Sequence, residues 1–459
     1  MKGKKTIKHS CRAAIAAVLL LIMLAASGLV YAAEGNNTDK SVSEPVKCKS
    51  GVLVTPIGDP DAEAPELSAK GAALYSLDMD RMVYGKNEDE KLDPYSTTKL
   101  LTCWLALDNL DPDETVTISE TATQEYLNGT TIWLKPGEKI TVRDLVYGAM
   151  LESGNDAAYA LGEAVAGSEA AFADLMNKTV KEWGCNDTHF VNANGWKNDD
   201  HYSTAHDMAI ITARCLENEM LRDISMTKSY TAKETNLSAA REMKNYFLHT
   251  EKNLKGLTGG KTGSWEDDDC SVVASFKRQG LKEVLVLLKA TKKGRPKDSA
   301  SLIEFSHEVT PGFAVPAEGS TVETAWIRHG ERTRAALTAD KVTYAYPAEN
   351  DAGDITTEIV YDRLEAPLKK GDVVGEFHIY ADDRLIGKKN LIATEDIETG
   401  WLPSYLYISN KATMNALKVI GLFILLLLLV STIGRKGASR RRQKKEARKR
   451  LREKYRSKH

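Results

Sequence analysis

The chain has 459 residues, 42% of them apolar and 27% charged, which is the composition of a globular protein long enough for two domains. The net charge of −2 hides an asymmetry, because residues 1–33 carry +5 and the tail 435–459 carries +12. Residues 34–434 therefore sum to −19. Duplex binding rests on the neutralisation of phosphates, so this acidic body excludes nucleic acid as an expected partner.

The N-terminus is typical of a secretory signal. A basic start is followed by an apolar run, Ala14 to Leu29, and then by small residues around Ala32 and Ala33. We therefore predict that residues 1–33 are a cleaved signal peptide; a retained membrane anchor is the alternative. Residues 34–65 are polar and acidic with little periodicity, which predicts a flexible lead-in.

Residues 66–310 have the pattern of one mixed domain. Four short runs are typical of strands: Gly71–Leu77, Met82–Tyr84, Ser271–Phe276 and Glu283–Leu288. The residues between them are mostly helical in pattern: Asp93-Pro94 opens an apolar helix, and residues 141–216 carry apolar side chains at helical spacing. A further helix is expected over Asp298–His307. Strands at both ends of a helical middle predict one sheet flanked by helices.

After Pro311-Gly312 the pattern changes to alternating apolar and polar residues, which predicts a separate small β domain over residues 315–395. Its expected strands are Thr321–Arg328, Lys341–Tyr346, Thr356–Tyr361, Val373–Tyr380 and Arg384–Ile392. Ala381-Asp382-Asp383 is expected to form the hairpin turn before the last of them.

The C-terminal part predicts a membrane anchor. A stalk at 396–415 leads to the apolar run 416–433, which would form a helix about 27 Å long. Five consecutive leucines from Leu425 leave no polar face, which disfavours the alternative of a buried core helix. The basic tail 434–459 is then cytoplasmic under the positive-inside rule, and the body lies outside the cell.

Removal of the signal would take Cys11 away and leave five scattered cysteines: Cys48, Cys103, Cys185, Cys215 and Cys270. At most two disulfides are possible, and the pattern does not choose among them. The nine histidines form no recognisable ligand cluster, so we expect no metal and no cofactor.

Three short elements in chain order carry chemistry: Ser96-Thr97-Thr98-Lys99, Ser153-Gly154-Asn155 and Lys261-Thr262-Gly263. Residues i and i+3 share a helix face, so the Lys99 amine can reach the Ser96 hydroxyl. A serine needs an adjacent base to act as a nucleophile, and a lysine can be that base only if its pKa falls well below about 10.4. Burial and the second cation, Lys261, would both lower the Lys99 pKa.

A second Ser-x-x-Lys sequence, Ser225-Met226-Thr227-Lys228, has the same spacing. It follows the Ser-Gly-Asn element and leads into polar sequence, whereas Ser96 precedes both other elements and leads an apolar helix. We therefore reject Ser225 as the nucleophile.

The chain resembles the serine-type D-alanyl-D-alanine carboxypeptidases, which are low-molecular-mass penicillin-binding proteins. Beyond the three elements, the resemblance rests on further segments: Gly129–Ile132, Leu134–Glu138, Thr141–Leu145, Glu152–Ala158, Thr188–Asn192, Asn194-Gly195 and His201–Met208. It covers about residues 66–310 and continues more weakly through Ala366–Gly375. It implies a β-lactamase/transpeptidase-like α/β (α+β) catalytic domain with a helical subdomain, followed by the small all-β domain and one transmembrane helix.

The resemblance implies that Ser96 attacks the carbonyl between two D-alanines of a peptidoglycan stem peptide, with Lys99 as general base. Ser153 and Asn155 would relay protons and position the substrate amide. β-Lactam antibiotics would be covalent inhibitors of Ser96.

The same resemblance assigns the substrate-binding residues. Lys261 and Thr262 would hold the substrate carboxylate, and the strand after Gly263 would pair with the peptide. The backbone N–H groups of Ser96 and Ser264 would form the oxyanion hole. Arg295 matches a carboxylate-binding arginine of the family; an exposed surface arginine is the alternative.

The chain departs from the family pattern after Gly263. Ser264 and Trp265 are followed by four acids, Glu266 to Asp269, which would repel an anionic substrate unless they turn into solvent. A class A β-lactamase is one rival, but it needs a Glu-x-x-Leu-Asn signature after the second element, and none lies between Asn155 and Lys261. A catalytically inactive wall-binding or sensor protein is another, and an endopeptidase acting on cross-links cannot be separated from a carboxypeptidase.

Overall fold

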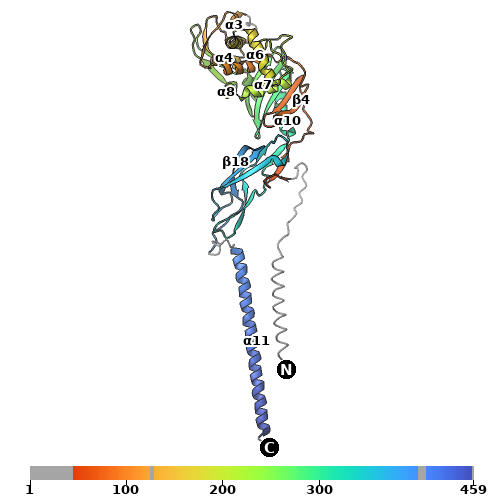
Figure 1. Cartoon of the computed structure of the whole chain (residues 1–459), viewed down its shortest axis with the longest axis vertical. Helices are drawn as coiled ribbons and strands as arrows, with labels where there is room; N and C mark the ends of the chain where they lie inside the picture. The colour runs from red at the N-terminus through yellow and green to blue at the C-terminus, as the bar shows by residue number, and fades with distance from the viewer. Residues whose placement is uncertain (1–44, 125–128, 402–409, 457–459) are drawn as a thin grey trace. The chain divides into compact units, whose positions relative to one another are not determined.

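The computed structural model describes residues 45–124, 129–401 and 410–456 (Figure 1). The predicted signal peptide lies outside these residues. Two domains lie in these residues: the predicted catalytic domain, in which helices flank a central sheet, and the small β domain.

The central sheet is antiparallel, with the strand order β4-β3-β11-β10-β9. Its strands are β3 (Gly71–Ser76), β4 (Arg81–Lys86), β9 (Leu257–Ser264), β10 (Cys270–Arg278) and β11 (Leu281–Ala290). Residues from both ends of the domain therefore form one sheet, as the sequence predicts. Strand β9 contains Lys261-Thr262-Gly263 and ends at Ser264, so the prediction of a strand after Gly263 is wrong by a few residues. It is an edge strand bonded to β10, and within the described residues no strand pairs with its other side, where a peptide strand could add.

Both faces of the sheet are buried. Val286 and Leu288 of β11 pack into a cluster with the helices of residues 99–225, whereas Leu285 and Leu287 pack into another with α10 (Gly294–Val309). Successive side chains of a strand point to opposite faces, so a strand covered on both faces is apolar throughout. This explains the unbroken apolar run in β11.

The helical side of the domain begins with the 3-10 turn η1 (Tyr95–Thr98), which continues into α2 (Lys99–Asn109). The other helices here are α3 (Thr121–Gln124), α4 (Val142–Leu151), α5 (Asn155–Ala166), α6 (Glu169–Glu182), α7 (Ala205–Glu217), α8 (Glu219–Ser225) and α9 (Tyr246–Thr250). Two small two-stranded sheets complete it: β5 (Thr115–Thr117) with β6 (Lys139–Thr141), and β7 (Ser229–Ala232) with β8 (Arg241–Lys244).

Helix starts follow local sequence. The side chains of Thr141, Ser168 and Thr204 each accept a hydrogen bond from the backbone N–H three residues on, at the starts of α4, α6 and α7. Such N-caps satisfy N–H groups that the helix itself leaves unpaired. The helical pattern of 141–216 is interrupted between α6 and α7, where residues 183–204 form irregular backbone.

The small β domain contains a sheet with the order β13-β14-β18-β17-β16. Its strands are β13 (Glu323–Trp326), β14 (Arg334–Ala339), β16 (Ile355–Tyr361), β17 (Val373–Ala381) and β18 (Arg384–Ala393), with the turn η2 (Ala352–Asp354) before β16. Asp382 and Asp383 have φ values of +48° and +61° and form the predicted hairpin turn. Strand β14 was missing from the sequence prediction.

The flexible lead-in predicted over 34–65 is wrong for residues 46–57. They form β1 (Val46–Lys47) and β2 (Leu53–Ile57), in a sheet with β12 (Gly312–Val315) and β15 (Thr343–Ala345). Val54 is fully buried against this domain. On one side β2 pairs with the adjacent β1, but its partner on the other side, β12, lies more than 250 residues away in sequence.

Helix α11 (Asn410–Arg456) contains the predicted span 416–433 and is long and apolar enough to cross a bilayer. Part of the predicted stalk, residues 410–415, is already helical, and 402–409 lie outside the described residues. The cysteines Cys48, Cys103, Cys185, Cys215 and Cys270 are buried free thiols.

Candidate active site

Ser96 lies in η1, where the turn packs against the edge strand β9. A Cβ atom on Gly263 would lie 2.8 Å from the Ser96 N atom, so glycine permits this close approach. Gly195 has φ +76°, and a Cβ atom there would clash with the Tyr95 carbonyl oxygen. Two glycines therefore allow the loop before α7 and strand β9 to press against the turn that presents Ser96.

Lys99, the first residue of α2, lies one turn from Ser96 with its side chain fully buried. Its Nζ donates to the Ser96 Oγ at 2.8 Å, to the Asn155 Oδ1 at 2.8 Å and to the Asn194 backbone oxygen at 2.7 Å. The amine is thus held on the serine by one amide side chain and one carbonyl. The spacing of Ser96 and Lys99 produces the contact expected from sequence.

The electrostatics of Lys99 favour its neutral form. Burial lowers the pKa of Lys99 well below its ordinary value, and the nearby Lys261 ammonium lowers it further. The three groups that hold the Lys99 amine, the Ser96 hydroxyl, the Asn155 amide and the Asn194 carbonyl, are all neutral. In the neutral form the two N–H groups of Lys99 serve the Asn155 and Asn194 oxygens, and its lone pair accepts the Ser96 O–H, which is the arrangement that activates a serine.

Ser153 lies between α4 and α5 with a left-handed φ of +59°. Such a conformation is strained for a non-glycine residue and persists only where neighbours fix it. Thr130 Oγ1 donates to the Ser153 backbone oxygen at 2.7 Å, and the Asn155 N–H donates to the Thr130 oxygen at 2.8 Å. The buried Asp156 accepts N–H bonds from the same loop at Ile132 and Leu134. In this conformation Ser153 lines the cleft.

Lys261 of β9 completes the cluster. Its Nζ donates to the Ser153 Oγ at 2.9 Å and to the Thr262 backbone oxygen at 2.8 Å. Burial lowers the pKa of Lys261 to about 7, although the Cys103 thiol opposes the shift and Arg295 adds to it. Two hydroxyl–amine pairs, Ser96 with Lys99 and Ser153 with Lys261, therefore face one cleft.

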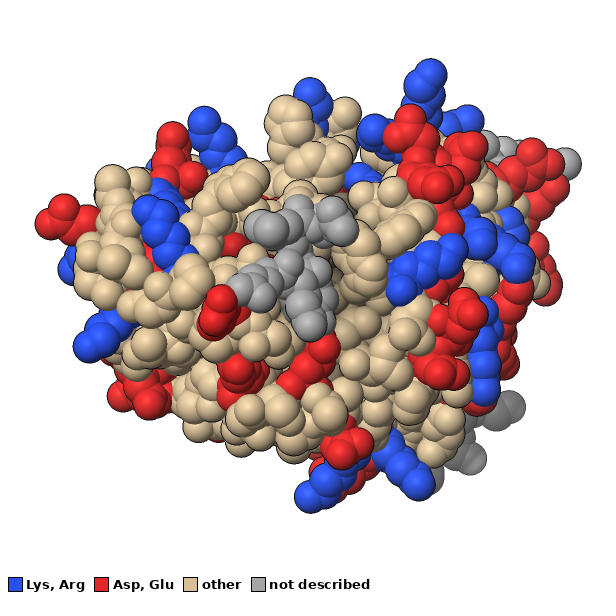
Figure 2. All heavy atoms as spheres, turned by 90° about the horizontal axis from the view of Figure 1, so that it is seen from above, with Lys and Arg blue, Asp and Glu red and all other residues tan. Residues whose placement is uncertain are grey.

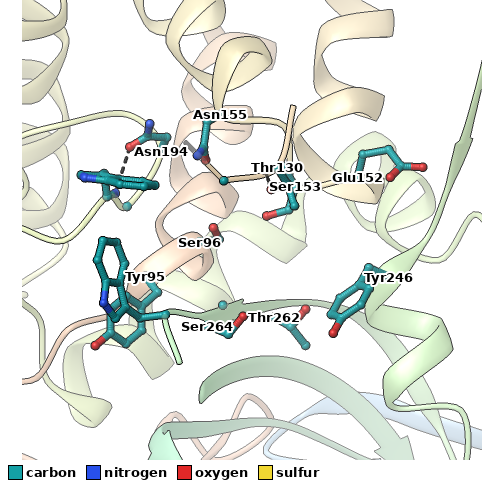
Figure 3. Close-up of a pocket in the computed structure, with 15 residues that line it drawn as sticks. Tyr95, Ser96, Thr130, Glu152, Ser153, Asn155, Asn194, Tyr246, Thr262 and Ser264 are labelled. Carbon is teal, nitrogen blue, oxygen red and sulfur yellow. Dashed lines mark hydrogen bonds between the residues drawn. The ribbon is translucent and has the colours of Figure 1, made fainter. Parts of the chain in front are cut away.

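The cleft is a cavity of about 330 Å³. It is lined by Tyr95, Ser96, Gly129, Thr130, Glu152, Ser153, Asn155, Asn194, Gly195, Trp196, Tyr246, Thr262, Gly263, Ser264 and Trp265 (Figure 3). Of the residues predicted from sequence, Ser96, Ser153, Asn155, Thr262, Gly263 and Ser264 line it directly. Lys99 and Lys261 lie beneath them and reach the two serines.

Comparison with known proteins decides the family. The family model described as D-alanyl-D-alanine carboxypeptidase matches residues 59–292, which is half of the chain and includes the whole cleft. The chain belongs to the D-alanyl-D-alanine carboxypeptidase family. A second model, described as the C-terminal domain of penicillin-binding protein 5, matches residues 313–399, the small β domain.

Individual members of the carboxypeptidase family cover most of the chain. It is 30% identical to the D-alanyl-D-alanine carboxypeptidase DacF of Bacillus subtilis, over 76% of this chain and 89% of that protein. The structure of penicillin-binding protein 5 from Haemophilus influenzae matches with a TM-score of 0.51 at 25% identity, covering 73% of this chain and 99% of that one. The Streptomyces K15 DD-transpeptidase matches with a TM-score of 0.50 at 29% identity, covering 53% and 99%.

Arg295 does not line the cleft of this family member. Its side chain is 3% exposed, and its Nε donates to Glu251 Oε1 at 2.9 Å, where the Glu251 side chain is fully buried. A direct contact with a substrate carboxylate would require Arg295 to leave this pair. In the structure Arg295 instead contributes positive charge that lowers the Lys261 pKa.

We predict that replacing Glu251 with glutamine destabilises the protein by about 3 kcal/mol, because it leaves the Arg295 guanidinium buried without its counter-ion. Chemical unfolding monitored by circular dichroism measures the change. Removing both charges, as in Glu251→Gln with Arg295→Met, should restore part of the loss; an additive double variant would contradict the coupling.

The acids after Gly263 turn away from the cleft. Glu266, Asp267 and Asp268 are exposed and do not line it, and Asp267 pairs with Lys292 at 2.8 Å. Asp269 accepts a hydrogen bond from the Tyr95 hydroxyl at 2.6 Å. On the face drawn in Figure 2, acidic and basic side chains are interspersed, so the negative charge is not gathered into one patch there. We therefore no longer expect these acids to repel an anionic substrate from the cleft.

Sequence reasoning missed the aromatic wall at one end of the cleft. Trp265 stacks on Tyr95 with ring centroids 6.4 Å apart and meets Trp196 edge to face at 4.8 Å. It also missed Glu152 and Tyr246 at the other end, and the Asn194 carbonyl that holds Lys99. Asn194-Gly195 was assigned to the family resemblance, but every residue has a backbone carbonyl, so the sequence could not indicate that the Asn194 carbonyl binds Lys99.

Proposed function

We propose that the chain is a serine D,D-carboxypeptidase that hydrolyses the terminal D-Ala-D-Ala bond of peptidoglycan stem peptides and so limits wall cross-linking. The observation that carries the proposal is the buried Lys99 amine 2.8 Å from the Ser96 hydroxyl. Family membership supports the same reaction and substrate.

In the acylation step, neutral Lys99 takes the Ser96 proton as Ser96 Oγ bonds to the carbonyl carbon of the penultimate D-alanine. The N–H groups of Ser96 and Ser264 stabilise the oxyanion, and the free edge of β9 pairs with the peptide. Asn155, whose Oδ1 accepts from Lys99, positions the substrate amide.

Ser153 then passes a proton to the departing amine as the C–N bond breaks. Lys261, bonded to Ser153 at 2.9 Å, supports that transfer, and with Thr262 it holds the terminal carboxylate. The Lys99 ammonium reprotonates Ser153, so Lys99 is neutral again when D-alanine leaves. Lys99 then takes a proton from water as the water oxygen bonds to the ester carbonyl carbon, and it gives that proton to Ser96 Oγ as the ester C–O bond breaks. One water is consumed in each cycle, and the protons balance.

We place the catalytic domain outside the cell. In this arrangement α11 crosses the membrane once, the preceding signal directs export, and the basic tail is cytoplasmic. The remaining partners of the proposal are β-lactams, which would mimic the substrate at Ser96; it requires no metal or cofactor.

The decisive test is incubation of the full-length protein in detergent with a peptide ending in D-Ala-D-Ala. Release of D-alanine supports the carboxypeptidase. A folded protein that releases none and takes up no fluorescent penicillin would instead support an inactive wall-binding or sensor protein.

We predict that penicillin acylates Ser96 and stays attached for minutes or longer, because no glutamate of the class A β-lactamase type follows Asn155 to activate a deacylating water. Gel fluorescence of a labelled penicillin, with peptide mapping by mass spectrometry, measures the adduct and its lifetime. Rapid turnover of penicillin with no surviving adduct would support the β-lactamase instead.

A further inference from the structure

Tyr95, the residue before Ser96, has an unusual conformation. Its φ is +51°, in the left-handed region that a large side chain rarely adopts, and it is only 2% exposed. Such a conformation persists only where surrounding contacts fix it. Figure 3 shows Tyr95 at one end of the cleft, with Ser96 and Ser264 further along it. The contacts of Tyr95 therefore bear on the position of the nucleophile.

The Tyr95 hydroxyl is bonded to the hairpin between β9 and β10. It donates to Asp269 Oδ2 at 2.6 Å, and Asp93 Oδ2 is a more distant acceptor at 3.4 Å. Burial, followed by the bond to Asp269, raises the pKa of Tyr95, so the hydroxyl keeps its proton near neutral pH. Lys289 lies 3.9 Å from the same Asp269 oxygen. The hydroxyl thus links two segments that are 174 residues apart in sequence.

The hairpin that receives this bond is closed next to Ser264. Ser264 pairs with Cys270 at the base of the hairpin. Just beyond this pair, the Trp265 N–H donates to the Asp269 backbone oxygen at 3.0 Å, and the Trp265 ring stacks on the Tyr95 ring. Asp269 is therefore held in a fixed position relative to Ser264, and a group that holds Asp269 also holds Ser264.

The two segments joined by the Tyr95 hydroxyl each supply one oxyanion donor. In the proposed mechanism the oxyanion lies between the N–H groups of Ser96 and Ser264. Tyr95 directly precedes the first, and the hairpin directly follows the second. Here β9 packs so closely on the turn that a Cβ atom on Gly263 would lie 2.8 Å from the Ser96 N atom and 3.0 Å from the Tyr95 Cβ atom. Such donors are effective only when they are preorganised around the transition state, so a bond across this contact affects the rate.

We propose that Tyr95 is a positioning residue: the bond from its hydroxyl to Asp269 fixes the separation of the two N–H groups that bind the oxyanion. This role rests on the proposed acyl-transfer function. It also gives a purpose to one of the four acids after Trp265. The Asp269 side chain is 15% exposed and faces Tyr95, whereas the other three acids are exposed to solvent.

Tyr95→Phe tests the role, because it removes the hydroxyl and keeps the ring that lines the cleft. With the full-length protein in detergent, kcat for a D-Ala-D-Ala peptide should fall about tenfold and KM should stay within about twofold. The loss is smaller than the roughly 10²- to 10³-fold cost of removing an oxyanion donor, because the N–H groups are displaced and not lost. Active sites are counted with labelled penicillin, so a loss of folded protein does not affect kcat.

A peptide boronic acid reports the oxyanion site directly. Its boron takes the Ser96 Oγ and becomes tetrahedral, which places a boronate oxygen between the two N–H groups. An analogue of the transition state loses affinity in proportion to the rate. The affinity of Tyr95→Phe for the boronic acid should therefore fall about tenfold, together with kcat.

Asp269→Ala should match Tyr95→Phe, since Asp93 still offers the hydroxyl an acceptor and only the bond to the hairpin is lost. The double variant should be no slower than either single variant, and Asp269→Asn, which retains an acceptor oxygen, should recover most of the loss. Tyr230→Phe is the matched control: the Tyr230 hydroxyl donates to Asp144 at 2.7 Å, and neither residue lines the cleft. It should leave kcat and boronate affinity unchanged.

Wild-type kcat and boronate affinity in both Tyr95→Phe and Asp269→Ala would overturn the positioning role. An equal loss in Tyr230→Phe would overturn it too, as would losses that add in the double variant. A wild type that releases no D-alanine overturns the proposed carboxypeptidase instead. In that case boronate affinity and the rate of penicillin acylation still decide the role of Tyr95, because both depend on the oxyanion site.

Discussion

Replacing Ser96 with alanine should lower D-alanine release by about 10⁴-fold or more, because removal of a nucleophile leaves only binding and oxyanion stabilisation. The variant should also fail to retain labelled penicillin. The hydroxyl lies where η1 meets the edge of β9, and Lys99 is held on it by Asn155 and the Asn194 carbonyl. Ser153, the other cleft serine that contacts a lysine amine, is bonded to Lys261 of β9 across the cleft.

Ser225→Ala is the matched control, since Ser225 has the same spacing to a lysine. Its hydroxyl is buried, donates to the Arg222 carbonyl at 2.7 Å and accepts from the Gly260 N–H at 3.3 Å. This change should cost some stability and retain penicillin labelling at Ser96. Labelling that survives in Ser96→Ala and disappears in Ser225→Ala would reverse the assignment of the nucleophile.

The three sequence elements of the candidate site were predictable because the proposed chemistry depends on residue type and order. Ser96 and Lys99 meet because they are three residues apart on one helical turn, and β9 lies beside them because strands at both ends of the domain join one sheet. The predicted nearness of Lys261 to Lys99 is also found, and it acts on the Lys99 pKa in the expected direction.

The remaining features depend on long-range contacts that leave no local signal. Strand β2 joins a sheet with β12, far along the chain, and its Val54 is buried in the core of the small β domain. From sequence Arg295 was expected to bind the substrate carboxylate, and only the fold shows that it forms a buried ion pair with Glu251. The four acids after Trp265 were expected to repel an anionic substrate, yet the hairpin between β9 and β10 exposes three of them to solvent. Composition gives the charge of a segment, whereas the turn decides where that charge points.

Replacing Lys261 with glutamine should lower kcat/KM for the peptide by about 10²- to 10³-fold, a size typical of losing a group that assists proton transfer. The loss has two sources: Ser153 loses the amine that donates to it at 2.9 Å, and the substrate carboxylate loses a cation. The pH profile separates this electrostatic role from a merely structural one.

The sign of the pH effect follows from the two lysines. Only neutral Lys99 can accept the Ser96 proton, so activity falls as pH drops through the Lys99 pKa. Burial is the main cause that lowers the Lys99 pKa, and the Lys261 cation lowers it further. The pKa of Lys261 is about 7, so Lys261 is charged at the acidic pH values where Lys99 becomes protonated. Glutamine removes that cation and raises the Lys99 pKa, and the acid limb of kcat/KM should therefore move to higher pH.

Lys261→Arg is the informative companion, because arginine keeps the positive charge at all accessible pH values. Its acid limb should stay near the wild-type position even if the geometry at Ser153 lowers the rate. Above pH 7 the wild type loses the Lys261 proton and should show a rising KM, which Lys261→Arg should not show. Initial rates with a D-Ala-D-Ala peptide from pH 5 to 10 measure both limbs. An acid limb that stays fixed in Lys261→Gln would mean that burial alone keeps Lys99 neutral, and the second cation would then serve only Ser153 and the substrate carboxylate.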